Sequence, residues 1–179
     1  MKRLLIILAL ISFCLAAKSQ INENSFQVGF GLQTDFLNIA FSDHTKTENT
    51  KVYVLGRFDD RINVKVGYSL NTVKQMEQNQ FKCIPSISAG IGYCFNNKKH
   101  EHFSTELFVS FSNSIAQFSG FENTNSTVEI NWHLFNTFFF GMGVKHSHFK
   151  HPFLSDEDNV FGIFWQLGGQ FLYPFKNNK

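Results

Sequence analysis

The segment FGIFWQLGGQFLYPF, from Phe161 to Phe175, alternates two kinds of side chain over fifteen residues. Most odd positions carry large apolar residues, whereas the even positions are mainly small or polar. Because successive side chains of a β-strand point to opposite faces, a period of two predicts a strand and not a helix. Strands of soluble proteins are usually about 5–6 residues long. The segment therefore predicts an unusually long strand with one strongly apolar face.

The same alternation recurs along the chain, most clearly in RINVKVGYSL, from Arg61 to Leu70. The parity slips where Phe36 and Leu37 are adjacent, which predicts a β-bulge between Asp35 and Leu37. Pro85 cannot donate a ladder hydrogen bond, so we expect a bulge or a frayed strand end there. The pattern predicts eight strands, at residues 26–41, 51–58, 61–71, 81–95, 102–117, 127–135, 137–149 and 160–175.

The predicted connections are of two lengths that alternate strictly. The short ones are residues 58–61, 96–101 and 135–137, and the long polar ones are 42–50, 71–80, 119–126 and 150–159. Short turns at one end and longer loops at the other are typical of bacterial outer-membrane barrels, in which the short turns face the periplasm. Both chain ends are then expected on the periplasmic side.

The first residues read as a targeting segment. Lys2 and Arg3 precede an apolar run from Leu4 to Ala17, and Ala17 and Ser19 are the small residues expected before a cut at Gln20. The run is shorter than the ~20 residues of a membrane span, which disfavours a retained anchor helix. The bulky Phe13 disfavours a lipoprotein at Cys14. We predict a signal peptide at residues 1–19 and a single barrel domain at residues 20–179.

Composition supports an exported membrane barrel. Charged residues make up 17% of the chain, below the ~25% of soluble domains, and 23 residues are Phe. After residue 19, no segment offers the ~18 consecutive apolar residues of a membrane helix. Loss of Lys2, Arg3 and Lys18 lowers Lys+Arg from 16 to 13 against 14 Asp+Glu, so no basic surface predicts binding to nucleic acid.

Two observations predict that the apolar face points outward to lipid. The opposite face consists of Gly, Ser and a few charges, whereas a face in water would be rich in Lys and Glu. The interior of an eight-stranded barrel is also just wide enough for side chains, so it could not hold so many aromatic rings. The alternative is a soluble periplasmic ligand-binding barrel with the two faces exchanged.

The chain resembles the small eight-stranded outer-membrane barrels of the OmpA/OmpX type over residues 21–179. The closing strand carries the resemblance, because Phe171, Tyr173 and Phe175 lie in step at its end. The resemblance implies a cell outer membrane location, contact with outer-membrane lipid, and recognition of the terminal aromatic residue by the barrel-assembly machinery. The tail Lys176–Lys179 departs from the family pattern, in which the aromatic residue is usually last. The compact size and Gln20 start also resemble proteins of the Bacteroidetes.

Parity places a set of polar residues inside the barrel. Charges that cannot reach water must pair, so we predict a hydrogen-bonded plug, with a gated narrow pore as the alternative. We expect a structural or interaction role at the envelope, no enzymatic activity, no cofactor and no metal. The predicted lumen residues are Arg57, Lys65, Glu106, Glu129, Lys145, Gln166 and Gln170, joined by His133.

His146 and His148 are predicted to lie on the outward face near the outer rim. With the nearby Asp156–Asp158 they faintly resemble the lipid A deacylase barrels, which use a His and a Ser two residues later. Here Ser147 points to the other face, so that spacing is missing, although a lipid-modifying enzyme stays an alternative function. Alternating histidines share a strand face, as metal ligands can, but no third ligand is defined. Cys83 and Cys94 have opposite parity, which excludes a disulfide.

Overall fold

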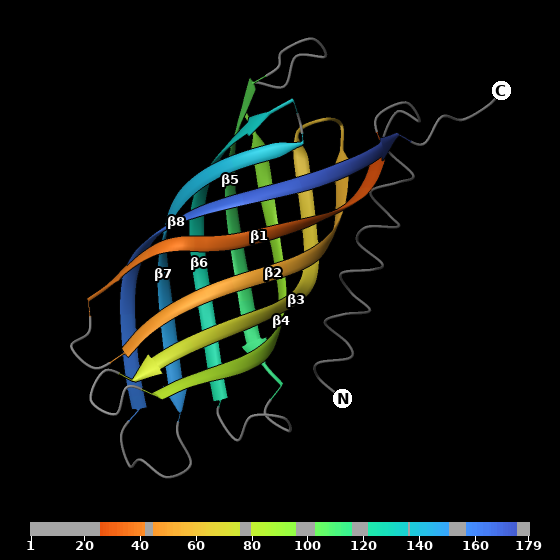
Figure 1. The fold of residues 1–179 in the computed structure, drawn as a ribbon. Helices are drawn as coiled ribbons and strands as arrows, with labels where there is room; N and C mark the ends of the chain where they lie inside the picture. Colours follow the sequence, from red (N-terminus) through yellow and green to blue (C-terminus); the bar gives the residue numbers. More distant parts are fainter. Residues whose placement is uncertain are drawn as a thin grey trace, which may run out of the picture.

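The computed structural model describes residues 26–41, 45–75, 80–95, 103–115, 122–135, 137–150 and 157–174. They form eight strands: β1 (Gln27–Ala40), β2 (Thr45–Phe58), β3 (Ile62–Gln75), β4 (Gln80–Cys94), β5 (Phe103–Ser114), β6 (Glu122–Leu134), β7 (Phe138–Lys150) and β8 (Glu157–Pro174). Each strand pairs antiparallel with the next, and β8 pairs with β1, so the sheet closes into a barrel (Figure 1). The predicted all-β class and eight-stranded up-and-down topology are confirmed.

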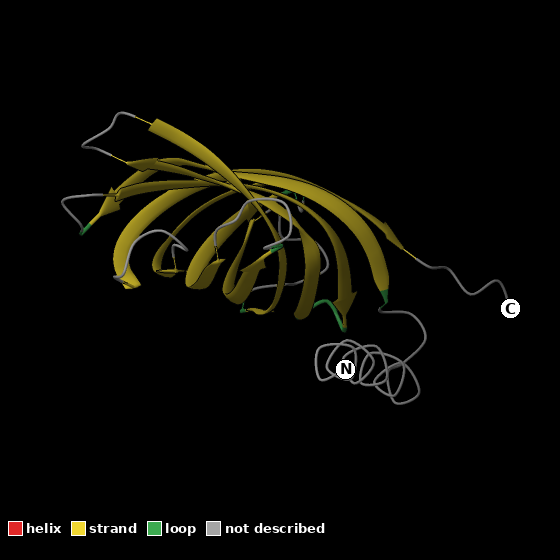
Figure 2. Ribbon diagram, turned by 90° about the horizontal axis from the view of Figure 1, so that it is seen from below, coloured by secondary structure: helices red, strands yellow, loops and turns green. Residues whose placement is uncertain are grey.

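The strands are strongly tilted. Following the paired residues once around the barrel from Gln27 on β1 leads back to β1 at Asn38, which is 11 residues farther along (38 − 27). A closed barrel with such an offset needs strands inclined to its axis, as the ribbon shows (Figures 1 and 2). Among the described residues, no helix is long and apolar enough to span a membrane.

The local irregularities follow the sequence. The β1–β8 register shifts between Asp35 and Leu37, which confirms the predicted bulge. At Pro85 the β3–β4 register continues without a shift, so the predicted alternative of a bulge is wrong there. The β4–β5 ladder instead ends at the Ser86–Ser114 pair, and the Ile115 amide donates to the Pro85 carbonyl at 2.9 Å. Pro85 therefore lies inside β4, which continues to Gln80 in pairing with β3, so the expected frayed end is also wrong on that side.

The turn between β2 and β3 explains why so short a connection suffices. Asp59 and Asp60 both have positive φ, at 49° and 53°, and the Arg61 amide donates to the Phe58 carbonyl at 3.0 Å. Two central residues with positive φ define the two-residue hairpin turn whose twist matches that of paired strands. Aspartate tolerates this conformation better than most side chains do.

The predicted strict alternation of connection lengths is wrong. β2 begins at Thr45 instead of residue 51, and β3 continues to Gln75, so only residues 41–44 and 76–79 connect these strands to their neighbours. Residues 95–102 at the opposite end form a longer connection. β6 and β8 also begin earlier than predicted, at Glu122 and Glu157. Ladder hydrogen bonds need no apolar side chains, so the strands continue through polar residues where the alternation fades.

The two faces of the barrel differ as predicted. Large apolar side chains are exposed on the outer face, with exposed fractions such as 63% for Phe30 and 64% for Phe138. The inward side chains are mostly polar and buried. The predicted signal peptide, residues 1–19, and Phe175 lie outside the described residues.

Candidate functional site

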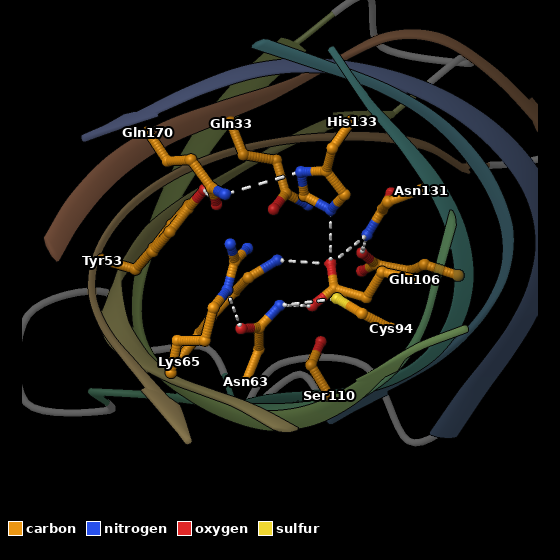
Figure 3. A network of polar contacts seen from close by, with 12 residues as sticks. Gln33, Tyr53, Asn63, Lys65, Cys94, Glu106, Ser110, Asn131, His133 and Gln170 are labelled. Carbon is orange, nitrogen blue, oxygen red and sulfur yellow. Dashed lines mark hydrogen bonds and ion pairs between the residues drawn. The ribbon is translucent and has the colours of Figure 1, made fainter. Parts of the chain in front are cut away.

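All predicted lumen residues are buried inside the barrel, each with an exposed fraction of 4% or less. They come from six of the eight strands, and the four that Figure 3 labels, Lys65, Glu106, His133 and Gln170, point into the barrel. The set is Arg57 on β2, Lys65 on β3, Glu106 on β5, Glu129 and His133 on β6, Lys145 on β7, and Gln166 and Gln170 on β8.

Glu106 is the centre of the first cluster. Its carboxylate accepts from Lys65 Nζ at 3.0 Å, from His133 Nε2 at 3.0 Å and from Asn131 Nδ2 at 3.3 Å. Asn63 Nδ2 donates to its other oxygen. The partners stand on β3 and β6, on either side of β4 and β5, so one carboxylate links strands that are not adjacent in the sheet (Figure 3).

The histidine of this cluster has partners on both ring nitrogens. Because His133 Nε2 donates to Glu106, its Nδ1 is the acceptor for Gln170 Nε2 at 3.5 Å. Arg57 Nε donates to Asn63 Oδ1 at 2.8 Å, and Asn63 in turn donates to Glu106. The predicted residues Arg57, Lys65, Glu106, His133 and Gln170 therefore belong to one hydrogen-bonded cluster.

Three aromatic rings surround the Lys65 ammonium. Its Nζ lies 4.2 Å from the ring centroid of Phe108, 5.3 Å from that of Phe139 and 5.4 Å from that of Tyr53. The electron-rich faces of aromatic rings attract cations, more strongly where water is excluded. The rings thus stabilise the Lys65 ammonium together with Glu106, whose carboxylate forms an ion pair with it.

Glu129 is the centre of the second cluster. It pairs with Lys51 Nζ at 3.5 Å and accepts from Gln166 Nε2 at 2.8 Å and from Thr127 Oγ1 at 2.9 Å. Gln33 Nε2 donates to Gln166 Oε1, which extends the cluster to β1. A third pair joins Lys145 Nζ to Asp35 Oδ2 at 3.3 Å.

Sequence reasoning missed several members of these clusters. Lys51 has the same parity as Arg57 on β2 and could have been found from it, but it stood at the edge of the predicted strand. Asp35 lies beside the bulge, where parity is ambiguous. Asn63 and Asn131 donate hydrogen bonds to the Glu106 carboxylate. Amide side chains are uncharged, so nothing in the sequence marks them for such a role.

Two apolar clusters adjoin the polar side chains, and the first lies among the partners of Lys65 and Gln170. Tyr53, Leu55 and Phe139 pack with Leu172, which lies near the end of β8. Toward one end of the barrel, buried residues near strand ends pack together: Val73, Ile84, Phe149 and Val160. A cavity between Lys51, Lys65 and Ser110 has about 10 Å³, which is room for about one water molecule.

On the outer face, the register of β6, β7 and β8 shows where the apolar surface ends. One row across these strands is Val128, Val144 and Ile163. The next row toward the β7–β8 connection is Ser126, His146 and Phe161, and the row after it is Thr124, His148 and Asn159.

The serine between the two outward histidines points into the barrel. Ser147 is buried at 1% exposure, whereas His146 and His148 are partly exposed on the other face, as their parity predicted. Cys83 is exposed and Cys94 buried, and both are free thiols. No group of three or more potential metal-ligating His, Cys, Asp or Glu residues is found within the described strands and turns.

No protein-family model and no curated protein matches the chain. Among solved structures, the N-terminal β-barrel domain of Pseudomonas aeruginosa OprF matches with 12% identity and a TM-score of 0.42, covering 83% of this chain and 98% of that one. Outer membrane protein AlkL in DMPC lipid bilayers matches with 8% identity and a TM-score of 0.45, covering 89% and 94%. Neisserial surface protein A matches with 12% identity and a TM-score of 0.41, covering 83% and 97%. These neighbours are small outer-membrane β-barrels, the class that the sequence resembles.

Proposed function

We propose that this chain is a small outer-membrane β-barrel with a closed polar interior, which stabilises the envelope or presents its loops to a partner. The observation that carries the proposal is that the outer face is apolar and the inner face polar, the reverse of a soluble protein. Apolar side chains cover the outside, while three lysine–carboxylate pairs lie within. We further propose that its surroundings are outer-membrane lipid and that the barrel-assembly machinery inserts it.

The exposed apolar surface has the dimensions of a membrane belt. On β7, outward residues from Phe138 to Val144 are apolar and His146 is the first polar one. The eight residue steps from Phe138 to His146 correspond to about 27 Å along the strand, or roughly 20 Å along the axis at the ~40° tilt of such barrels. The apolar band of outer-membrane barrels is about 25 Å tall.

Aromatic side chains gather at one border of this belt. Tyr93 and Phe95, at the end of β4, meet edge to face with ring centroids 5.3 Å apart. Trp132 and Phe140 stack at 5.7 Å. Aromatic girdles mark the interfaces of membrane barrels, and here the girdle lies at the end of the barrel where β1 starts and β8 ends. A soluble ligand-binding barrel would instead bury these rings, and monomeric soluble proteins rarely expose apolar patches above a few hundred Å².

Closure of the interior is supported by its contents. Ion pairs, amides and the first apolar cluster fill the middle, and the second apolar cluster lies toward one end. Eight strands leave an interior that side chains can fill. These features favour a plug over a gated narrow pore. The burial of Ser147 gives no support to a deacylase-like serine, so we do not propose a lipid-modifying enzyme.

The test combines location with conductance. We expect the protein in the outer-membrane fraction, with unheated samples migrating differently from heated ones on detergent gels. Reconstituted in planar bilayers, it should show no steady conductance. Water-soluble protein with unshifted mobility would contradict the membrane location, and a steady open channel would contradict the closed interior.

A further inference from the structure

We infer that His146 and His148 form a two-histidine chelate for a borderline divalent cation, Zn²⁺ or Cu²⁺, on the outer face of β7. The inference does not depend on the proposed function, because the two histidines lie on the outer face and take no part in the polar interior. It goes beyond the sequence, which offered two alternating histidines and nothing to orient them.

The two histidines share one strand face. Both have even parity on β7, and both are partly exposed, whereas Ser147 between them is buried. Residues two apart on a strand lie about 6.7 Å apart. Bonds of 2.0–2.1 Å to a tetrahedral zinc ion bring the two nitrogens to about 3.3 Å from each other. Two imidazoles that lean together from this spacing can reach that separation.

The neighbouring strand β8 positions both rings. His148 Nδ1 donates to Asn159 Oδ1 at 3.0 Å, so the lone pair of this imidazole is on Nε2. Histidines that bind metals almost always donate their other ring N–H in this way, which sets the tautomer and the ring orientation. The His146 ring packs on Phe161 with centroids 4.5 Å apart. Asn159 and Phe161 thus restrain the two rings from the same side.

The donor chemistry selects the class of cation. Neutral imidazole favours Zn²⁺, Cu²⁺ and Ni²⁺ over Mg²⁺ and Ca²⁺, which prefer oxygen. In the register, Ser126 is opposite His146 and Thr124 is opposite His148 on β6, so no cationic side chain flanks the pair on that strand. The next outward residue on β7, Lys150, is opposite Glu122 in the register. Water or a lipid oxygen would complete the coordination.

The experiment titrates the full chain, purified in detergent without a histidine tag, with Zn²⁺ by calorimetry and with Cu²⁺ by electron paramagnetic resonance. We expect binding with hyperfine coupling to two nitrogens. His146→Gln and His148→Gln should each remove one nitrogen coupling and lower affinity at least about tenfold. Asn159→Ala should lower affinity by about tenfold while both couplings stay, since loss of an orienting partner typically costs 10–100-fold.

A second alternating pair in the sequence, His100 and His102, provides the matched control. The variant H100Q/H102Q should keep the two-nitrogen signal. Heat-modifiable gel mobility of each variant would establish that the barrel is folded. The inference is overturned if wild-type protein binds neither ion, if H146Q and H148Q bind as wild type does, or if the signal disappears with H100Q/H102Q.

Discussion

Replacement of Glu106 tests whether the polar interior depends on its central carboxylate. Glu106→Gln keeps the shape of the side chain but removes its charge, which leaves the Lys65 ammonium buried without its ion-pair partner at 3.0 Å. It also presents an amide to the donors Asn63, Asn131 and His133. Breaking a buried pair by removing one member typically costs about 3–5 kcal/mol, because the remaining charge is uncompensated.

The magnitude for this barrel should lie near the lower end of that range, about 3 kcal/mol. The three rings around Lys65 keep part of its stabilisation, since cation–π contacts contribute up to about 2 kcal/mol where water is excluded. The double variant Glu106→Gln/Lys65→Met should be more stable than the single one by about 2 kcal/mol or more, because it removes the unpaired charge and replaces a buried pair by an apolar side chain.

The assay is reversible urea unfolding in lipid vesicles, followed by fluorescence of Trp132 and Trp165. The exposed Glu122→Gln is the matched control and should change the free energy of unfolding by less than about 0.5 kcal/mol. If the single and double variants are equally unstable, the cost does not come from the uncompensated charge of Lys65. If Glu106→Gln behaves like Glu122→Gln, the pair contributes nothing measurable and the reasoning about the interior fails.

Three further predictions concern other parts of the barrel. Ile130→Arg, on the apolar belt, should cost about 2–4 kcal/mol in the same unfolding assay, whereas Ser126→Arg on the same strand face should cost about 0–1 kcal/mol, because the cost of a charge facing lipid falls toward the interface; equal costs would contradict the assigned border. Phe149→Ala should cost about 3–5 kcal/mol, as for other buried Phe residues, and a value below 1 kcal/mol would show that its cluster is not tightly packed. Phe175→Ala should slow insertion by purified barrel-assembly machinery in proteoliposomes while spontaneous refolding in detergent is unchanged; unaltered insertion would contradict the role implied by the family resemblance.

The sequence predicted the strands and their faces because period-two alternation reports which side of the wall a residue occupies. It placed Lys65 and Glu106 inside for that reason. It could not predict that they pair, since they are 41 residues apart on strands that are not adjacent in the sheet. Their contact spans the inner face of β4, which lies between them, so it depends on the stagger of three strands and on the small inward residues of β4, such as Gly92.

Strand ends were the least successful prediction, for a related reason. Alternation of apolar and polar residues marks the part of the wall whose outer face is apolar. Beyond it both faces meet polar surroundings, and the register of β2 with β3 continues through Glu48–Thr72 and Asn49–Asn71 without any apolar signal. The amino-acid pattern therefore indicates the height of the apolar belt better than it indicates the length of the strands.

Glycine explains how so narrow a barrel accommodates ion pairs and rings together. Gly92 on β4 is an inward position, and a Cβ atom there would lie 2.6 Å from Glu106 Oε1 and 2.6 Å from the Phe108 ring. Gly168 on β8 is paired in register with Phe139, and the Phe139 ring occupies the space that a side chain at Gly168 would need. Small residues on one strand thus make room for large ones on its neighbour. The inward glycines therefore provide the space that the lumen carboxylates and rings occupy. Enlarging a glycine should displace the carboxylate or ring next to it.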